Sequence, residues 1–498
     1  MSFISTRGGA CVTASQAILR GLAPDGGLYV PTVFPQMKPA DIASLAQMDY
    51  RARALTILRG FLDDFTSAEL EQAIAEAYST PKFDTPAIAP VKKLNDTTHV
   101  LELFHGPTLA FKDMALQLLP HLTTLSARKN GEHHEIAILV ATSGDTGKAA
   151  LEGFKDVPGT SCTVFYPTDG VSDVQKLQMT TTGGSNTHVI AINGNFDDAQ
   201  SGVKALFASE KFHQQVAERG KVLSSANSIN FGRLVPQIVY YFSAYAELLA
   251  SGAIALGDSV NFVVPTGNFG NILAGYYARC MGLPVGRLIC ASNRNNVLTD
   301  FFTNGVYDTR RQFYKTTSPS MDILISSNLE RLLFECADRD GALIRRWMEQ
   351  LKQSHSYAIG EQRLDWLLSV FAAGYADDSE GADEIARVFH QDHYLMDTHT
   401  AVASRVLRQY REKTGDMTQT VIVSTASPYK FAADVLASVA GRDEVKGLDA
   451  FACSERLSAV SGLPVPEQVS ALRTLPIRHT AHCEKDAMAQ AVLSAFGA

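Results

Sequence analysis

Several segments of the chain carry residues whose types and spacing suit chemistry on a small polar molecule. The first is His105-Gly-Pro-Thr-Leu-Ala-Phe-Lys-Asp113, in which Lys112 lies between an aromatic residue and an acid, after a Gly-Pro turn. Lysine becomes a useful nucleophile when an apolar pocket lowers its pKa. Taken by itself, the segment favours a solvated lysine opening an amphipathic helix from Lys112 to Leu119. The assignment of Lys112 therefore depends on the other segments.

A second segment ends an apolar strand at Thr142-Ser143-Gly144 and begins a helix near Asp145. Small hydroxyl side chains and free N–H groups at a helix N-terminus favour an anion such as a carboxylate or a phosphate. The pair Gly147-Lys148 raises the hypothesis of a nucleotide-triphosphate loop. Thr142 stands at the leading glycine position, however, and Ala149 replaces the required hydroxyl residue. We therefore reject a nucleotide triphosphate as the ligand.

Two further strand ends carry candidate ligand loops. The loop Pro265-Thr-Gly-Asn-Phe-Gly-Asn271 opens a helix, and it suits one phosphate better than a dinucleotide, because the Gly-x-Gly-x-x-Gly spacing and a ribose-binding acid are missing. Backbone N–H groups for such a phosphate come from Gly267, Asn268, Phe269, Gly270 and Asn271. A plain strand-to-helix turn explains the loop equally well. The strand Val421–Val423 ends at Ser424 and Thr425, whose hydroxyls are expected in the same crevice.

The elements between these loops predict an α/β architecture. Short β-branched runs predict strands at Val100–Leu103, Ile136–Ala141, Cys162–Tyr166, His188–Ala191, Asn261–Val264, Leu288–Ala291 and Val421–Val423. Helical patterns separate most of them, including Ala199–Ala208, Val235–Ala250, Ile272–Cys280 and Ala401–Arg411. Strands joined by helical crossovers indicate largely parallel sheets, and ligands of such sheets bind at the carboxyl ends of the strands.

The N-terminal part predicts a separate, mainly helical unit. Helical spacing covers Asp41–Gln47, Tyr50–Leu62 and Ser67–Tyr78, with Ser67 as the expected N-cap of the last helix. Three prolines, Pro81, Pro86 and Pro90, mark its expected end. We therefore predict an N-terminal domain of residues 1–90 and a two-lobed catalytic domain of residues 91–498. Within the helical stretch 329–390, the acid-rich run from Asp377 to Glu384 is expected to be a solvated loop.

Composition and charge argue against several classes of protein. The net charge of -8 and the pI near 5.9 argue against a nucleic-acid binder. Seven scattered cysteines without a Cys-x-x-Cys pair argue against a disulfide framework and a structural zinc site. The pair His133-His134 lies in a polar loop, and His479, His482 and Cys483 near the C-terminus have no matching acids, so we expect no metal. With neither a signal-peptide pattern nor a membrane-spanning run, we expect a cytoplasmic protein without membrane contact.

Together, a lysine in an apolar pocket, a cradle for one phosphate and nearby hydroxyl donors match pyridoxal 5'-phosphate, an aldehyde that needs these groups. The chain also resembles the threonine synthase family, and most of all its longer fungal and bacterial type. The resemblance runs from Ser5-Thr-Arg-Gly8 to about Phe431. The motifs that carry it are His105–Asp113, Ala141–Gly147, Ser225–Asn230, Pro265–Asn271 and Ser424–Pro428.

The resemblance implies a fold-type-II pyridoxal phosphate enzyme, similar to the β subunit of tryptophan synthase. It implies conversion of O-phospho-L-homoserine and water to L-threonine and phosphate, the last step of threonine biosynthesis. Lys112 would form the Schiff base with the cofactor, Gly267–Asn271 would hold its phosphate, and Thr425 would meet its ring nitrogen. Asp145 stands where shorter relatives carry asparagine near the cofactor 3′-oxygen, and whether it contacts the cofactor is left open.

For the substrate, the candidates at the α-carboxylate are Ser143 and Thr146. Candidates at the substrate phosphate are Asn227, Ser228 and Arg233, since an arginine fork matches phosphate oxygens. A solvated charge at a helix start is the alternative for Arg233. The alternative functions are a related β-eliminating lyase or dehydratase, which needs no second phosphate site, and a threonine-synthase-like protein that binds the cofactor without catalysis. Monomer and homodimer are both left open.

Overall fold

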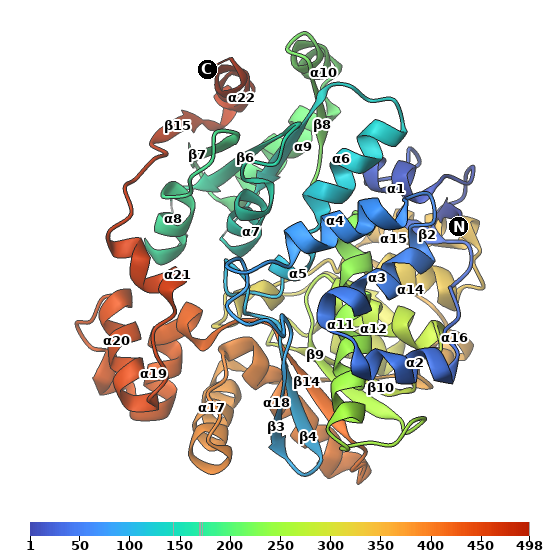
Figure 1. The fold of residues 1–498 in the computed structure, drawn as a ribbon, viewed down its shortest axis with the longest axis vertical. Coiled ribbons are helices and arrows are strands. Elements are labelled where there is room, and N and C mark those ends of the chain that lie inside the picture. Colours follow the sequence, from blue (N-terminus) through green and yellow to red (C-terminus); the bar gives the residue numbers. More distant parts are fainter. Residues whose placement is uncertain (143, 169–170, 172, 498) are drawn as a thin grey trace.

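The computed structural model describes residues 1–142, 144–168, 171 and 173–497, which form two parallel-rich sheets surrounded by helices (Figure 1). The six-stranded sheet has the order β13-β10-β9-β14-β4-β3, and only its β3–β4 pair is antiparallel. Its strands are β3 (Val91–Asn95), β4 (Thr98–Glu102), β9 (Val260–Pro265), β10 (Val285–Ser292), β13 (Phe371–Tyr375) and β14 (Thr420–Ser424). The five-stranded sheet, of order β15-β7-β6-β5-β8, is parallel throughout. Its strands are β5 (Glu135–Ala141), β6 (Thr160–Pro167), β7 (Thr187–Asn193), β8 (Lys221–Ser224) and β15 (Ala481–Glu484).

All of the strands predicted from β-branched runs are present in these two sheets, so the parallel-rich α/β architecture is confirmed. Every residue of β9 and β14 is buried, as is typical of central parallel strands that helices cover on both faces. The edge strand β15 is not among the predicted strands, because it is short and mostly exposed. Two small antiparallel pairs complete the strands: β1 (Phe3–Ser5) with β2 (Tyr29–Pro31), and β11 (Val306–Asp308) with β12 (Ser356–Ala358).

The long helix α11 (Phe231–Ala250) lies near the middle of the molecule and is buried around almost its whole circumference (Figure 1). A helix that is apolar on all sides needs neighbours on all sides, and α11 packs against α3 (Tyr50–Phe61), α5 (Asp113–Leu116) and α12 (Gly270–Cys280). Arg53 of α3 also forms an ion pair with Glu247 of α11 at 2.6 Å. The N-terminal helices thus share a hydrophobic core with the rest of the chain, and a domain boundary at residue 90 stays a prediction.

The N-terminal helices predicted from apolar spacing are present, with one cap corrected. They are α2 (Pro39–Ser44) with the 3₁₀ turn η1 (Leu45–Gln47), α3 and α4 (Ser67–Ala77), whereas the helix α1 (Ala14–Arg20) was not predicted. The prediction of Ser67 as N-cap of α4 is wrong, because Thr66 holds that position. The Thr66 hydroxyl accepts the Glu69 N–H at 3.2 Å, and Glu69 accepts the Thr66 N–H at 2.7 Å, which completes a capping box.

The acid-rich run 377–384 is helical, so its prediction as a solvated loop is wrong. It opens α17 (Asp378–Asp392), where Asp377 is the N-cap and Glu380 closes a capping box. Glu384 is fully buried and forms ion pairs with Arg387 at 2.8 Å and Arg408 at 3.1 Å. The cluster of acids therefore serves the first turn of a helix, where negative charge is favourable.

Most of the remaining helices surround the sheets, whereas α19 (Ala432–Ala440) and α20 (Ala450–Ser461) pack against each other at the periphery (Figure 1). The others are α6 (Leu119–Lys129), α7 (Asp145–Phe154), α8 (Asp173–Thr180), α9 (Phe196–Ala208), α10 (Glu210–Ala217), α13 (Val297–Asn304), η2 (Pro319–Met321), α14 (Leu329–Cys336), α15 (Gly341–Ser354), α16 (Glu361–Leu368), α18 (Thr398–Thr414), η3 (Pro428–Phe431), η4 (Arg442–Val445), α21 (Glu467–Ser470), η5 (Ala471–Arg473), η6 (Lys485–Ala487) and α22 (Met488–Phe496). After α21 the chain returns to the smaller sheet, where β15 pairs with β7. Among the described helices, none is both long and apolar enough to cross a membrane.

Candidate active site

Lys112 lies in the interior, directly before the short helix α5. Its side chain is 12% exposed, and its Nζ donates to Ser320 Oγ at 3.0 Å and to Asp145 Oδ2 at 3.3 Å. Burial lowers the pKa of Lys112, and the charges of Lys430 and Arg233 lower it further, whereas Asp145 opposes them. The alternative of a solvated lysine is therefore wrong. The helix expected from Lys112 to Leu119 is also interrupted, because α5 ends at Leu116 and α6 starts at Leu119.

The segment before Lys112 is fastened to the end of strand β14. The Phe111 N–H donates to the Thr425 carbonyl at 2.9 Å, and the Ser427 N–H donates to the Leu109 carbonyl at 3.0 Å. An antiparallel bridge between Ala110 and Ala426 lies between these two bonds. Lys112 and the buried Thr425 are therefore held at the same strand end, as the sequence predicts.

The glycine and the acid of the Lys112 segment support this turn. Asp113 is fully buried and accepts hydrogen bonds at 2.8 Å from both the N–H and the hydroxyl of Thr108. A Cβ at position 106 would lie 2.6 Å from the Asp113 side chain, so only glycine fits beside it. Burial raises the pKa of Asp113 to about 6, although its hydrogen bonds from Thr108 oppose this shift. Gly106, Thr108 and Asp113 thus shape the loop that presents Lys112.

Asp145 opens helix α7 and faces two lysines. Its Oδ2 accepts from Lys112, and its Oδ1 lies 2.8 Å from Lys430 Nζ. Burial alone would raise the pKa of Asp145, but the charges of Lys430 and Lys112 outweigh it and hold that pKa well below its usual range. The Thr142 hydroxyl accepts the N–H groups of Gly144 and Gly147, both at 3.0 Å, which shapes the strand-to-helix turn.

The predicted carboxylate site lies in the same turn. Thr146 is half-buried in the first turn of α7, next to Asp145. Ser143 falls outside the described residues. The N-terminus of α7 therefore faces the region of Lys112, where the positive end of the helix dipole favours an anion.

The loop at 267–271 has the form of a phosphate cradle between β9 and α12. Its carbonyl groups are occupied, since Ser326 Oγ donates to the Gly267 carbonyl at 2.7 Å, and the Asn328 N–H and Nδ2 both donate to the Asn268 carbonyl at 3.0 Å. Phe269 adopts the left-handed conformation with φ of 62° and, among the described residues, caps α12 without a side-chain hydrogen bond. The first N–H groups of α12 thus remain free for a ligand.

Two details of this cradle fit the phosphate of pyridoxal phosphate. A Cβ at Gly267 would lie 2.6 Å from the Ser320 carbonyl, so the backbone approaches this closely only with glycine. Asn271 Oδ1 accepts from the hydroxyls of Tyr240 at 2.6 Å and Tyr241 at 2.9 Å. Its Nδ2 is buried without a partner in the part of the chain that the structure describes. A buried donor beside free N–H groups is what a bound monophosphate would satisfy.

Among the residues predicted to bind the substrate phosphate, Arg233 is the one that the structure buries. It lies in the first turn of α11, is only 4% exposed and donates from Nη1 to the Ala226 carbonyl at 2.7 Å. Its Nε is buried, and no partner for it exists among the described residues. Burial lowers the pKa of Arg233 to about 10, which still leaves it charged at neutral pH. The alternative of a solvated helix-start charge is therefore wrong.

The other two candidates for the substrate phosphate lie in the loop that leads to α11. Asn227 is exposed and Ser228 is half-buried. The Asn227 carbonyl accepts the Asn230 N–H at 3.1 Å, and Asn230 Oδ1 caps α11 by accepting the Gly232 N–H at 2.8 Å. The structure thus brings the whole loop next to Arg233, while a ligand role of these two side chains stays a prediction.

Four residues of this site are not predicted from the sequence. Ser320 contacts Lys112, and its N–H donates to His399 Nε2 at 3.1 Å. Since Nε2 accepts, the His399 proton lies on Nδ1, which donates to Asp397 Oδ2 at 2.8 Å. Lys430 Nζ donates to the Thr108 carbonyl at 2.9 Å and pairs with Asp145. Sequence spacing gives no signal for Ser320, which is 208 positions from Lys112.

Arg331, also not predicted, connects the two anion loops to the N-terminal segment. Its side chain is fully buried, and burial lowers its pKa to about 10. Its Nε donates to the Tyr29 carbonyl at 2.9 Å, its Nη2 to the Ile229 carbonyl at 2.6 Å and its Nη1 to Asn328 Oδ1. Because Asn328 in turn binds the Asn268 carbonyl, one guanidinium fixes both loops relative to each other.

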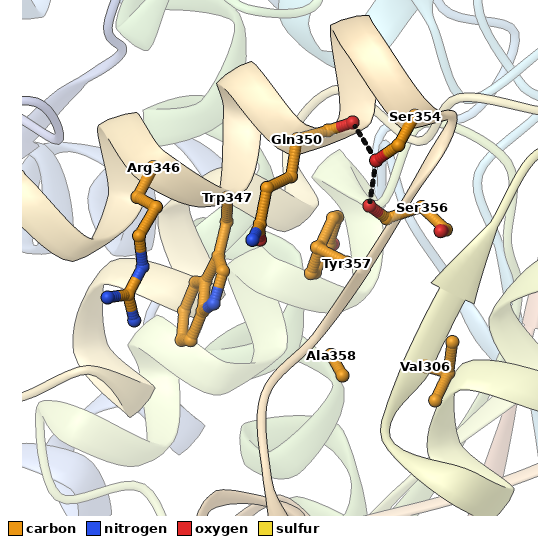
Figure 2. A pocket seen from close by; sticks show the side chains of 8 residues that line it. All are labelled: Val306, Arg346, Trp347, Gln350, Ser354, Ser356, Tyr357 and Ala358. Carbon is orange, nitrogen blue, oxygen red and sulfur yellow. Dashed lines mark hydrogen bonds between the residues drawn. The ribbon is translucent and has the colours of Figure 1, made fainter.

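A separate surface pocket of about 450 Å³ lies between α15, β11 and β12 (Figure 2). Its lining residues are Val306, Arg346, Trp347, Gln350, Ser354, Ser356, Tyr357 and Ala358. Figure 2 shows Ser354 bridging the two sides, since its Oγ donates to the Gln350 carbonyl at 2.8 Å and to the Ser356 carbonyl at 3.2 Å. None of the predicted site residues lines this pocket, so it is distinct from the Lys112 site.

Comparison with known proteins agrees with this site. Residues 2–78 match the family model "Threonine synthase N terminus", and residues 75–426 match "Pyridoxal-phosphate dependent enzyme". The chain is 42% identical to threonine synthase of Pseudomonas aeruginosa, over 86% of this chain and 89% of that protein. It is 41% identical to human threonine synthase-like 1, over 85% of this chain and 57% of that protein.

A solved structure agrees along the whole length. The crystal structure of PLP-bound threonine synthase from Brucella melitensis superposes with a TM-score of 0.88 at 39% identity, covering 100% of both chains. The fold-type-II architecture and the cofactor expected from the sequence are thereby confirmed. The chain belongs to the threonine synthase family of pyridoxal-phosphate-dependent enzymes.

Proposed function

We propose that the chain converts O-phospho-L-homoserine and water to L-threonine and phosphate. The observation that supports this substrate is Arg233, a buried and charged guanidinium whose charge acts on Lys112 and whose Nε has no partner among the described residues. It lies in α11, whereas the cradle for the cofactor phosphate is the separate loop 267–271. A second anion site beside the reactive lysine suits a substrate that carries its own phosphate. A β-eliminating lyase acting on serine has no need of it.

Bound pyridoxal phosphate supplies an electron-withdrawing ring that stabilises negative charge on the substrate carbons next to the amino group. Lys112 would hold the cofactor covalently through its amine and, once released, would take the proton from the substrate Cα. Its low exposure and lowered pKa support this role, because only a neutral amine can accept a proton. The same amine is suited to move the Cβ proton, whose loss leads to departure of phosphate from Cγ.

The remaining residues orient the cofactor and the substrate. Thr425 would meet the ring nitrogen with a neutral hydroxyl, which leaves that nitrogen less protonated than a carboxylate partner would. Asp145 is placed to orient the Lys112 amino group rather than to contact a negatively charged oxygen, because both of its oxygens already face lysines. Ser143, Thr146 and the N–H groups of the α7 N-terminus would bind the substrate α-carboxylate. Asn227 and Ser228 would join Arg233 at the substrate phosphate.

We also propose that the protein works in the cytoplasm. The support is chemical, since its seven cysteines are all free thiols and Cys11 is exposed. A reducing compartment keeps such thiols unpaired. The number of subunits is left open.

The test is product analysis with purified, cofactor-loaded protein. O-Phospho-L-homoserine should yield phosphate and L-threonine in equal amounts, whereas L-serine should yield little pyruvate. Pyruvate from serine without threonine from phosphohomoserine would replace the proposal with a β-eliminating lyase. Cofactor binding without turnover of either compound would instead identify a non-catalytic relative.

A further inference from the structure

A second buried lysine lies inside the active site, on the far side of Asp145 from Lys112. Lys430 belongs to the 3₁₀ turn η3 and is 3% exposed at its side chain. Its Nζ lies 2.8 Å from Asp145 Oδ1 and donates to the Thr108 carbonyl at 2.9 Å. Lys112 Nζ reaches the other oxygen, Oδ2, at 3.3 Å. One carboxylate therefore faces two lysine side chains, one at each oxygen.

The two lysines differ in their contacts with this carboxylate and in their second hydrogen-bond partners. Lys430 has the shorter contact with the carboxylate, and its Nζ also donates to the Thr108 carbonyl. Lys112 has the longer contact, and its second partner is the hydroxyl of Ser320, which can bond a neutral amine equally well. Of the two amino groups, that of Lys112 therefore loses less stabilising interaction when it is deprotonated.

The surrounding charges act in the same direction. Arg233 on α11 and Lys430 on η3 both oppose a positive charge on Lys112, and Asp145 on α7 favours it. His399 on α18 faces Asp145 and is held by Asp397. Beyond Lys430, the buried Asp113 feels the same ammonium, which lowers the Asp113 pKa against the effect of burial. If Lys430 and Arg233 are charged, a third cation in this buried space is costly.

We propose that Lys430 is a positioning residue whose ammonium group binds Asp145 and thereby leaves the neighbouring Lys112 as a free amine. The inference rests on the proposed role of Lys112 as the reactive amine. Without Lys430, Lys112 would be the only lysine left at the Asp145 carboxylate, which would then hold a proton on the Lys112 amine. Lys430 would thus act on the reaction entirely through Asp145, without touching cofactor or substrate.

The test measures the protonation of Lys112 directly, in the full-length protein freed of cofactor. Competitive labelling with acetic anhydride at a series of pH values, followed by peptide mass spectrometry, gives the titration midpoint of each lysine. In the wild type, the midpoint of Lys112 should lie below that of Lys446, whose side chain is 77% exposed. Equal midpoints for these two lysines would overturn the proposal without any variant.

The variants separate charge from packing. In Lys430→Met the Lys112 midpoint should rise by about one pH unit or more, the size expected when one nearby like charge is lost. Lys430→Arg keeps the charge and should restore the wild-type midpoint, which a merely structural role of Lys430 would not predict. An unchanged midpoint in a folded Lys430→Met protein, checked by circular dichroism, would contradict the inference.

The outcome is separable from that of the proposed function. Wild-type protein that forms threonine, together with a Lys112 midpoint insensitive to Lys430, would refute this inference alone. A Lys112 midpoint that depends on Lys430, in a protein that forms no threonine, would refute the proposed function alone. In the loaded enzyme, where substrate binding releases the Lys112 amine, the acidic limb of the pH profile of kcat should move upward in Lys430→Met by a similar amount.

Discussion

Replacing Arg233 tests the assignment of the second anion site. Its Nη1 donates to the Ala226 carbonyl, and in the part of the chain that the structure describes its Nε has no partner. The expected contact with a substrate phosphate is one charge-assisted hydrogen bond or a fork of two. Such a bond to a charged group contributes about 1.5–3 kcal/mol. At about 1.4 kcal/mol per factor of ten, Arg233→Met should lower kcat/KM for O-phospho-L-homoserine about 10- to 150-fold.

Methionine is the informative replacement because it keeps most of the buried apolar volume. Removing a buried charge whose Nε has no protein partner should cost little stability, and it can even stabilise the fold. We therefore expect a melting temperature within a few degrees of the wild type and an unchanged dissociation constant for pyridoxal phosphate. Steady-state kinetics, thermal unfolding and cofactor titration measure the three quantities separately.

A loss of cofactor affinity equal to the loss of kcat/KM would refute this reasoning, since it would put Arg233 at the cofactor phosphate instead. Arg331→Met is a useful contrast. All three nitrogens of Arg331 bind protein acceptors. Its replacement should therefore lower the melting temperature as well as activity.

Two further predictions concern the cofactor cradle and the stability of the fold. Gly267→Ala puts a Cβ 2.6 Å from the Ser320 carbonyl, so cofactor affinity in an equilibrium titration should fall at least about tenfold. The control is Gly381→Ala, where a Cβ meets no atom within 4 Å and cofactor affinity should stay unchanged. Equal affinities in the two variants would refute the assignment of the cofactor cradle. Burial alone would lower the pKa of His105, but its hydrogen bonds to Asp84 and Glu102 raise it to about 9. Because this folded-state pKa exceeds the usual 6.5, the stabilising contribution is complete below about pH 6.5 and is lost as the pH rises through 9. Urea unfolding across this range should show the decline in wild type and not in His105→Gln, and parallel curves for the two proteins would contradict the assignment.

The inner strands of both sheets were predictable because burial leaves a strong local pattern, whereas the edge strands β3, β8, β13 and β15 were not predicted. The sequence of β5, Glu-Ile-Ala-Ile-Leu-Val-Ala, is apolar almost throughout, and the structure buries its five central residues. Each candidate ligand loop follows such a strand, so its place at the carboxyl edge of a sheet followed from the parallel order. Edge strands such as β15 have no such pattern, because solvent covers much of them.

Residues that meet only through the tertiary fold were not predictable. Ser320 and His399 reach the Lys112 region from loops and helices distant in sequence, and their local sequence resembles ordinary polar chain. Lys430 was visible only as the fourth residue of Ser-Pro-Tyr-Lys, and its contact with Asp145 joins positions 285 residues apart. The residue preferences for N-caps also gave a wrong prediction at α4, where two neighbouring residues suit the cap. Thr66 and Ser67 both suit an N-cap, and the register of Glu69 decides for Thr66.

The environment of Lys112 in the structure differs most from what its local sequence favours. Its neighbours in sequence favour a solvated helix start, whereas the bond from Phe111 to the Thr425 carbonyl turns the segment inward. The side chain then meets Asp145 and Ser320. The apolar residues around Lys112 in sequence did not by themselves indicate this, because the elements that enclose them, α7, α11 and the chain after β14, are distant in sequence.

The most direct test of the central claim is turnover of O-phospho-L-homoserine in heavy-oxygen water. If phosphate leaves by cleavage of its bond to Cγ and water then adds at Cβ, the label must enter the hydroxyl of L-threonine. The released phosphate must then keep its original oxygens. Mass spectrometry of both products distinguishes this from hydrolysis at phosphorus, which would give labelled phosphate and homoserine. Labelled threonine with unlabelled phosphate is the predicted result, and labelled phosphate without labelled threonine would contradict the proposed reaction.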